Sequence, residues 1–174
     1  MNRRPAESEY APSYAAYVGK VSDSTDILAT LEGQRGQLAA LPHNVTGDLE
    51  THRYAEGKWS VREVIGHVCD AERVFGYRIF CMSRGDTQSL PGFDENVYAE
   101  RSGSHQRPIA DLVAELVLLR DANLSLLRNL DAEAWSRTGV ANNKPFTVRA
   151  LIHVLAGHCR HHLDILRERY GVTI

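Results

Sequence analysis

Four long stretches of this 174-residue chain repeat apolar side chains at the spacing of an α-helix, and this periodicity constrains the fold more than any other feature. No segment shows the sustained two-residue alternation that is typical of a half-buried strand. The predicted helices occupy residues 14–38, 60–85, 109–130 and 146–170. Four such helices with short to medium connections predict an all-α fold, a four-helix bundle.

The ends of these helices carry recognisable capping residues. Ser60 followed by Glu63 forms a capping box at the start of the second helix. Thr147 is expected to cap the fourth helix, which ends before Gly171. Ser24 is a candidate cap that divides the first predicted helix into two pieces.

The remaining segments are expected to connect these helices within one domain. We predict a single domain over residues 1–174, because this length suits one sizeable core. Residues 1–12 are expected to form a polar N-terminal arm, and residues 42–50 and 137–145 to form loops. Residues 84–107 form a longer predicted loop. Loops beyond about 12–15 residues in a compact domain are usually functional or mobile.

Composition excludes several kinds of partner and location. The 20 basic and 22 acidic residues leave a net charge of −2, which is a poor match to the phosphates of nucleic acid. No run approaches the roughly 18–20 apolar residues that cross a bilayer, and the N-terminus lacks the apolar core of a secretory signal. The three cysteines form no C-x-x-C pair, which favours a reducing compartment. We therefore expect a cytoplasmic protein that binds neither nucleic acid nor membranes.

Half of the eight histidines lie in the fourth predicted helix, within the sequence HVLAGHCRHH. Each residue of an α-helix turns by about 100°, so counting assigns every side chain to a face. His158 and His162 fall within the apolar stripe that faces the bundle interior. His153 falls on the charged, solvated face, and His161 lies on the flank of the stripe.

Two inward imidazoles one turn apart have two interpretations. An unpaired buried polar group costs about 1–3 kcal/mol, so each ring needs a partner. Either both residues are core histidines hydrogen-bonded to neighbouring helices, or they bind one metal ion. His67, at the margin of the apolar stripe on the second predicted helix, offers a third imidazole from a facing helix. Three histidines with open remaining positions are typical of a catalytic metal site. Cys159 follows His158, so the H-E-x-x-H motif of zinc proteases is absent.

The pattern W-S-x-x-E-x-x-x-H in the second predicted helix and the pattern G-H-x-x-x-H in the fourth resemble the DinB-like superfamily. The branch that the chain resembles is that of the YfiT-like metal-dependent hydrolases and thiol transferases. The resemblance implies a four-helix bundle, often a homodimer, that binds one divalent ion through His67, His158 and His162. It also implies low-molecular-weight thiols as cosubstrates in some members.

A divalent ion at such a site supports two reactions on a small-molecule substrate. It lowers the pKa of a bound water toward about 7 for hydrolysis, or it binds a thiol as the nucleophilic thiolate for S-transfer. The resemblance favours the thiol-dependent S-transferase slightly over the hydrolase. The alternatives are a bundle that binds a metal or ligand in a stress response without turnover, and a structural dimer without metal. Imidazoles bind several metals, of which we expect zinc or nickel.

Several further residues lie near the predicted ligands or within reach of them. Asp70 lies about one turn from the predicted ligand on the same helix and is a candidate to orient that imidazole, although a solvent-facing carboxylate is commoner. Arg73 and Arg78 could clamp an anionic substrate, but arginines on helix faces are more often solvated. His105 in the long loop could act as an acid over the site, and Trp59 is expected to pack as an apolar anchor.

Overall fold

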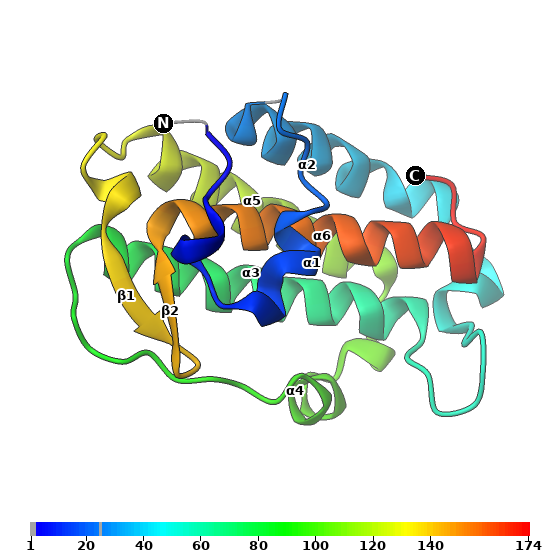
Figure 1. Ribbon diagram of the computed structural model, residues 1–174. Coiled ribbons are helices and arrows are strands. Elements are labelled where there is room, and N and C mark those ends of the chain that lie inside the picture. The colour runs from blue at the N-terminus through cyan, green and yellow to red at the C-terminus, as the bar shows by residue number, and fades with distance from the viewer. Residues whose placement is uncertain (1–2, 25) are drawn as a thin grey trace.

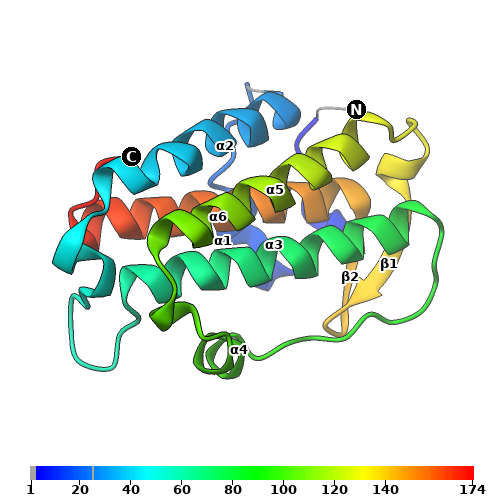
Figure 2. The same ribbon diagram turned by 180° about the vertical axis from the view of Figure 1, so that it is seen from behind.

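The computed structural model describes residues 3–24 and 26–174, and it confirms the predicted all-α four-helix bundle (Figure 1). The bundle helices are α2 (Ile27–Asn44), α3 (Val61–Ser83), α5 (Ile109–Arg128) and α6 (Val148–Tyr170). α2 packs chiefly against α5 and α6, and α3 packs against the same two helices. The helices α2 and α3 are therefore diagonal to each other, as two opposite views show (Figures 1 and 2). None of the described helices is both long and apolar enough to cross a membrane.

Both helices that carry the histidines begin at the predicted caps, and α6 also ends at the predicted Gly171. The amide of Glu63 donates to Ser60 Oγ, and the amide of Ser60 donates back to the Glu63 carboxylate at 2.6 Å. Thr147 Oγ1 accepts a hydrogen bond from the first turn of α6. Gly171 ends α6 with φ at 70°, in the left-handed region that favours glycine. These caps fix where α3 and α6 start, and hence the faces that their histidines occupy.

Helix α2 departs from the prediction at both ends. It is capped by Asp26 rather than by Ser24, since the Asp26 carboxylate accepts two amides of the first turn and suits the positive end of the helix dipole. It also continues past Pro42, which was predicted to lie in a loop. Pro42 removes only its own amide from the helix, and the amide of Val45 still donates to the carbonyl of Leu41 at 2.8 Å.

A buried ion pair lies between two apolar clusters of the core. In α5, residues up to Leu116 belong to one cluster and those from Leu124 to the other, with Arg120 between them. Arg120 has no exposed surface, and its Nε and Nη2 donate to the two carboxylate oxygens of Glu72 at 2.8 and 2.9 Å. Its Nη1 donates to Gln34 Oε1. This charge is therefore matched and fully hydrogen-bonded.

The predicted loop at residues 137–145 is wrong, because most of it forms a β-hairpin. Strands β1 (Thr138–Ala141) and β2 (Lys144–Thr147) pair antiparallel. Asn142 and Asn143 make the two-residue turn with φ at 51° and 56°, a conformation that asparagine tolerates. Leu90 pairs with β1 and Tyr10 pairs with β2. The hairpin thus joins the N-terminal arm to the segment that follows α3.

The segment 84–107 also contains regular structure that the periodicity did not reveal. Helix α4 (Glu95–Arg101) begins after Asp94, whose carboxylate accepts two amides of the first turn. The other short helices are α1 (Ala15–Val18) and the 3-10 helices Glu7–Glu9, Pro12–Tyr14, Gly47–Thr51, Ser104–Gln106 and Ala134–Ser136. Seven residues are too few to show a convincing apolar stripe, so α4 was predicted as loop.

Helix α1 lies directly on α6, in front of it in Figure 1. A Cβ atom at Gly157 would lie 1.9 Å from the carbonyl oxygen of Tyr17, so only a residue without a side chain permits this approach. The contact brings the ring of Tyr17 against two histidines. Its centroid lies 5.4 Å from that of His158 and 5.6 Å from that of His161.

Candidate metal centre

Three histidines from two facing helices converge in the bundle interior. α6 carries His158 and His162 one turn apart, and α3 carries His67 opposite them. One ring nitrogen from each lies within 4.8 Å of those of the other two. The Nε2 atoms of His67 and His158 are 3.0 Å apart. The structure therefore brings together the three imidazoles that were predicted as ligands.

The arrangement fits a shared cation better than a hydrogen-bonded core. Two nitrogens that bind one zinc ion at about 2.0–2.1 Å stand about 3.0–3.4 Å apart, which matches the separation of His67 and His158. The alternative interpretation is that these are ordinary core histidines. In that case neighbouring helices would supply hydrogen-bond partners for the other ring nitrogens. Yet Nδ1 of His67 and Nδ1 of His162 are buried without a hydrogen-bond partner among the described residues. The donor set of three imidazoles suits zinc, nickel, copper or iron.

Burial keeps all three imidazoles in the form that coordinates metals. Removal from water lowers the pKa of His67 to about 4 and that of His158 to about 3. The same cause holds the pKa of His162 well below its ordinary value of 6.5. At neutral pH the three rings are therefore uncharged, and each offers a lone pair without first losing a proton.

Aromatic rings surround the three histidines. Trp59 lies against His67 with ring centroids 4.9 Å apart, and Phe75 lies 5.7 Å from His158. Together with Tyr17 they shield the imidazoles from bulk water. Trp59 packs as predicted, but it packs on a candidate ligand and also lines the neighbouring cavity.

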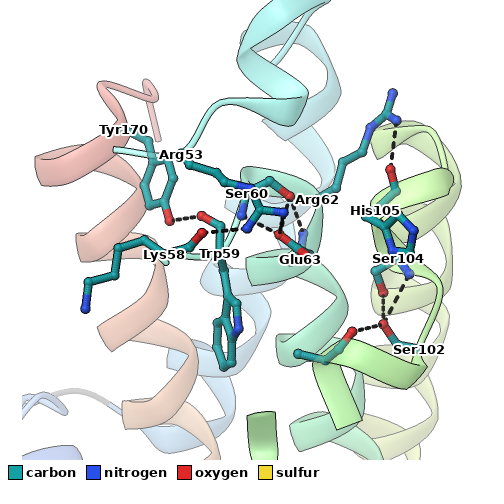
Figure 3. A network of polar contacts seen from close by, with 11 residues as sticks. Arg53, Lys58, Trp59, Ser60, Arg62, Glu63, Ser102, Ser104, His105 and Tyr170 are labelled. Atoms are coloured by element: carbon teal, nitrogen blue, oxygen red, sulfur yellow. Dashed lines mark hydrogen bonds and ion pairs between the residues drawn. The ribbon is translucent and has the colours of Figure 1, made fainter. Parts of the chain in front are cut away.

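A polar network holds Trp59 in this place (Figure 3). The hydroxyl of Tyr170 donates to the carbonyl of Trp59 at 2.6 Å. The Glu63 carboxylate binds the amide and hydroxyl of Ser60, and it pairs with Arg53 at 2.8 Å. Burial alone would raise the pKa of Glu63, but the hydrogen bonds from Ser60 and Arg53 outweigh it and lower this pKa. Glu63 thus acts as the predicted cap and stabilises the start of α3.

The segment after α4 is fastened to α3 in the same region (Figure 3). The hydroxyls of Ser102 and Ser104 are 2.7 Å apart. A Cβ at Gly66, the residue before His67, would meet Ser104 Oγ at 2.0 Å, so the segment packs directly on the helix. His105 is exposed, and only its carbonyl takes part, accepting from Arg62 at 3.3 Å. Its side chain does not line the cavity at the site.

A cavity of about 460 Å³ opens onto the three histidines. Its size is typical of a small-molecule site. Its remaining polar lining consists of Ser13, Tyr14, Tyr17, Arg78, Glu95, Asn142, Lys144 and His161. A second cavity of about 240 Å³ shares Trp59 and His162 with the first. His162 therefore borders both cavities.

Asp70, Arg73 and Cys159, which are near the candidate ligands in sequence, do not line the cavity at the site. Asp70 is half-buried, and it makes no hydrogen bond to the His67 ring among the described residues. Arg73 instead pairs with Glu115 at 2.7 Å. Cys159 is buried in the apolar core, where burial raises the pKa of its thiol. These side chains make no contact that would assist chemistry at the three histidines.

His153 was predicted to face solvent, and this prediction is wrong. Its side chain is only 3% exposed, and its Nδ1 lies 2.9 Å from the carbonyl oxygen of Arg149. The N-terminal arm covers this face of α6, since the Glu9 carboxylate binds the guanidinium of Arg149 and the hydroxyl of Thr147. Helical counting identifies the face of a residue but not the segment that covers it.

Three polar residues of the cavity lining, Glu95, Asn142 and Lys144, were missed by sequence reasoning. Burial lowers the pKa of His67, and the negative charge of Glu95, at the start of α4, opposes this lowering in part. Burial raises the pKa of Tyr17, and Glu95 adds to this rise. Asn142 and Lys144 come from the hairpin. Each belongs to a short element without detectable periodicity. For Glu95, the available signal was the length of the segment 84–107, which indicated a functional or mobile loop.

Comparisons with known proteins point to one family. The sequence model of the DinB superfamily matches residues 5–166. A protein of Oceanobacillus iheyensis, named provisionally as a metal-dependent hydrolase, is 22% identical over 144 residues, which cover 82% of this chain and 83% of that protein.

Solved structures share the fold. YfiT from Bacillus subtilis, described as "a probable metal-dependent hydrolase with an unusual four-helix bundle topology", superposes with a TM-score of 0.72 at 20% identity, over 99% of this chain and 95% of YfiT. A DinB-like protein of the same bacterium, YjoA, has a TM-score of 0.60 at 18% identity, over 84% of this chain and 90% of YjoA. The four-helix bundle of this chain is thus a fold that these two solved structures share.

Proposed function

The chain belongs to the DinB superfamily, and from this premise we propose that it is a divalent-metal-dependent enzyme that hydrolyses a small molecule. The observation that carries the proposal is the cluster of three buried, uncharged imidazoles at the wall of a cavity. The names of the Oceanobacillus relative and of YfiT support the same class of reaction. His67, His158 and His162 would hold the ion, and zinc or nickel remains the expected metal.

An ion held by three imidazoles keeps positions open and lowers the pKa of a coordinated water or thiol toward neutrality. The residues of the chain prepare the surroundings for this chemistry. Trp59 packs against His67 and Phe75 packs against His158, so these aromatic rings cover part of the imidazole surface. Glu95 is the carboxylate of the cavity lining, so it is the candidate to accept a proton during hydrolysis. Burial first, and then Glu95, raises the pKa of Tyr17, so its hydroxyl stays protonated and can donate.

Thiol-dependent S-transfer is the second candidate, and the two cavities favour it. Both cavities are lined by Trp59 and His162, so a thiol in one and an electrophile in the other would approach the same candidate ligand. A non-catalytic metal-binding role is the remaining alternative. A homodimer without nucleic-acid partners stays a prediction.

The first test is metal uptake. We expect the wild-type chain to retain about one zinc or nickel ion after dialysis, measured by elemental analysis, because three ligands hold an ion that two hold weakly. His158→Ala is expected to lose this ion. His161→Ala is the matched control, since His161 lines the same cavity next to His162 but lies outside the trio.

Turnover assays then separate the candidate functions. Metal-loaded protein is expected to cleave esters or amides, and His158→Ala to be inactive although circular dichroism shows it folded. Consumption of a thiol without hydrolysis would identify the transferase instead. Retention of metal without any turnover would identify a binding protein. Absence of a stoichiometric ion in the wild type, or equal uptake by His158→Ala, would refute the metal site itself.

A further inference from the structure

We propose that Arg78 forms a binding site for an oxyanion, so that the small molecule in the cavity carries a carboxylate or phosphate group at the end remote from the three histidines. Arg78 and His67 line the same cavity and stand on the same helix. Eleven residues separate them, which is about three helical turns and about 16 Å along the axis. Eleven steps of about 100° also return to nearly the same face of α3.

Arg78 is a buried charge without a protein counterion. Its residue is 2% exposed, and no carboxylate lies within 4.0 Å of its guanidinium among residues 3–24 and 26–174. The other deeply buried arginine, Arg120, is by contrast fully paired with Glu72. Removal of a charge from water is costly unless a counterion is present, so an anion that enters the cavity would be bound favourably by this group.

The guanidinium keeps donors available for a ligand. Nη2 donates to the carbonyl of Pro91 at 2.6 Å, and the guanidinium carbon lies 5.6 Å from the ring centroid of Phe75. These two contacts fix the orientation of the group. The described part of the chain provides no hydrogen-bond partner for Nε or Nη1. A planar guanidinium with free N–H groups matches the geometry of a carboxylate or phosphate.

The surroundings of Arg78 are suited to an anion. Pro91 follows Leu90, which pairs with the hairpin, so the hairpin residues Asn142 and Lys144 lie toward this end of the cavity. Lys144 adds a second positive charge and Asn142 an amide donor. Glu95, the acidic group of the lining, acts on His67 rather than on Arg78. The cavity is thus acidic near the histidines and basic near Arg78.

This inference deepens the proposed function, but anion binding itself requires no metal. The experiment therefore uses metal-free protein, in which a carboxylate cannot bind to a cation at the histidines. Isothermal titration calorimetry compares three probes of equal chain length: hexanoate, hexyl phosphate and neutral hexanamide. We expect the wild type to bind at least one of the two anions about tenfold more tightly than hexanamide.

Variants test the residue. Arg78→Gln is expected to weaken anion binding about tenfold or more, and Arg78→Lys to restore it only in part, because an ammonium group lacks the planar fork. Arg84→Gln is the matched control, since Arg84 also lies over an aromatic ring, Phe80, but is exposed and outside the cavity. It is expected to bind the anions as the wild type does.

The outcomes decide the proposal even if Arg78→Gln unfolds. Equal affinity of the wild type for hexanoate, hexyl phosphate and hexanamide would overturn it without any variant. Equal weakening by Arg84→Gln would overturn it as well. A preference for hexanoate or for hexyl phosphate identifies the anion. Because metal uptake is measured separately, failure of the anion site and failure of the metal site are distinguishable.

Discussion

The most deeply buried charges of the bundle, those of Arg120 and Glu72, neutralise each other. Arg120 and Glu72 form a bidentate pair in the core, and Gln34 completes the hydrogen bonding of the arginine. The three histidines avoid an unpaired buried charge in another way. Burial lowers their pKa values, so they lose the charge rather than acquire a partner for it.

Removal of one member of the buried pair is expected to be costly. Arg120→Met leaves the Glu72 carboxylate buried without its partner, which we expect to reduce the free energy of unfolding by about 3–5 kcal/mol. Urea denaturation followed by circular dichroism measures this change. Arg128→Met is the matched control on the same helix, because its pair with Glu32 is about half exposed and is worth less than about 1 kcal/mol. Similar losses in the two variants would show that the buried pair contributes no more than a surface pair.

The candidate site could be predicted residue by residue only in part. Helical counting placed His158 and His162 in the interior and His67 at its margin, because each lies on a long, clearly periodic helix. The same counting failed for His153, which the N-terminal arm covers. The burial of Arg78 could not be predicted either, since it depends on the segment around Pro91 and not on α3 alone. Local periodicity contains no information about such distant segments.

At the scale of elements, the contact between α1 and α6 depends on the absence of a side chain at Gly157. Gly157→Ala would place a methyl group 1.9 Å from the carbonyl oxygen of Tyr17, so α1 must move away from α6. We expect a loss of about 1–3 kcal/mol in the free energy of unfolding. Gly33→Ala is the control, because Gly33 lies in α2 with open space around it and alanine favours a helix by about 0.5–1 kcal/mol. Chemical denaturation of both variants is expected to give shifts of opposite sign, and a stabilised Gly157→Ala would contradict the close approach.

The four long helices were predictable because each extends over many turns and carries its own caps. The hairpin and α4 were not, since four-residue strands and a seven-residue helix are stabilised by contacts with distant segments. β1 pairs with Leu90 and β2 pairs with Tyr10, both far away in sequence. These short elements provide Glu95, Asn142 and Lys144 to the cavity. The candidate ligands could therefore be predicted from the sequence, but the cavity residues that α4 and the hairpin provide could not.

At the scale of the whole molecule, the histidines make the stability of the metal-free protein depend on pH. The pKa values of His67 and His158 in the folded state are about 4 and about 3, below the ordinary value of 6.5 that applies to an unfolded chain. As the pH falls below 6.5, the unfolded chain binds protons that the folded chain does not. The stability from these groups is thus present above pH 6.5 and is lost as the pH falls toward 4.

We expect the melting temperature of chelator-treated protein to be lower at pH 5.5 than at pH 7.5, measured by differential scanning calorimetry. His158→Asn removes one of the groups responsible and is expected to reduce this difference. A melting temperature that rises on acidification would contradict burial of neutral imidazoles.

The diagonal placement of α2 and α3 has a consequence for synthesis on the ribosome. Both helices leave the exit tunnel before α5 and α6, the helices against which they chiefly pack. His67 therefore emerges 91 residues ahead of His158, at a stage when α3 still lacks α5 and α6 to pack against. The three side chains can therefore bind an ion together only after α6 has been translated. Metal binding is thus a late step that follows the synthesis of nearly the whole chain.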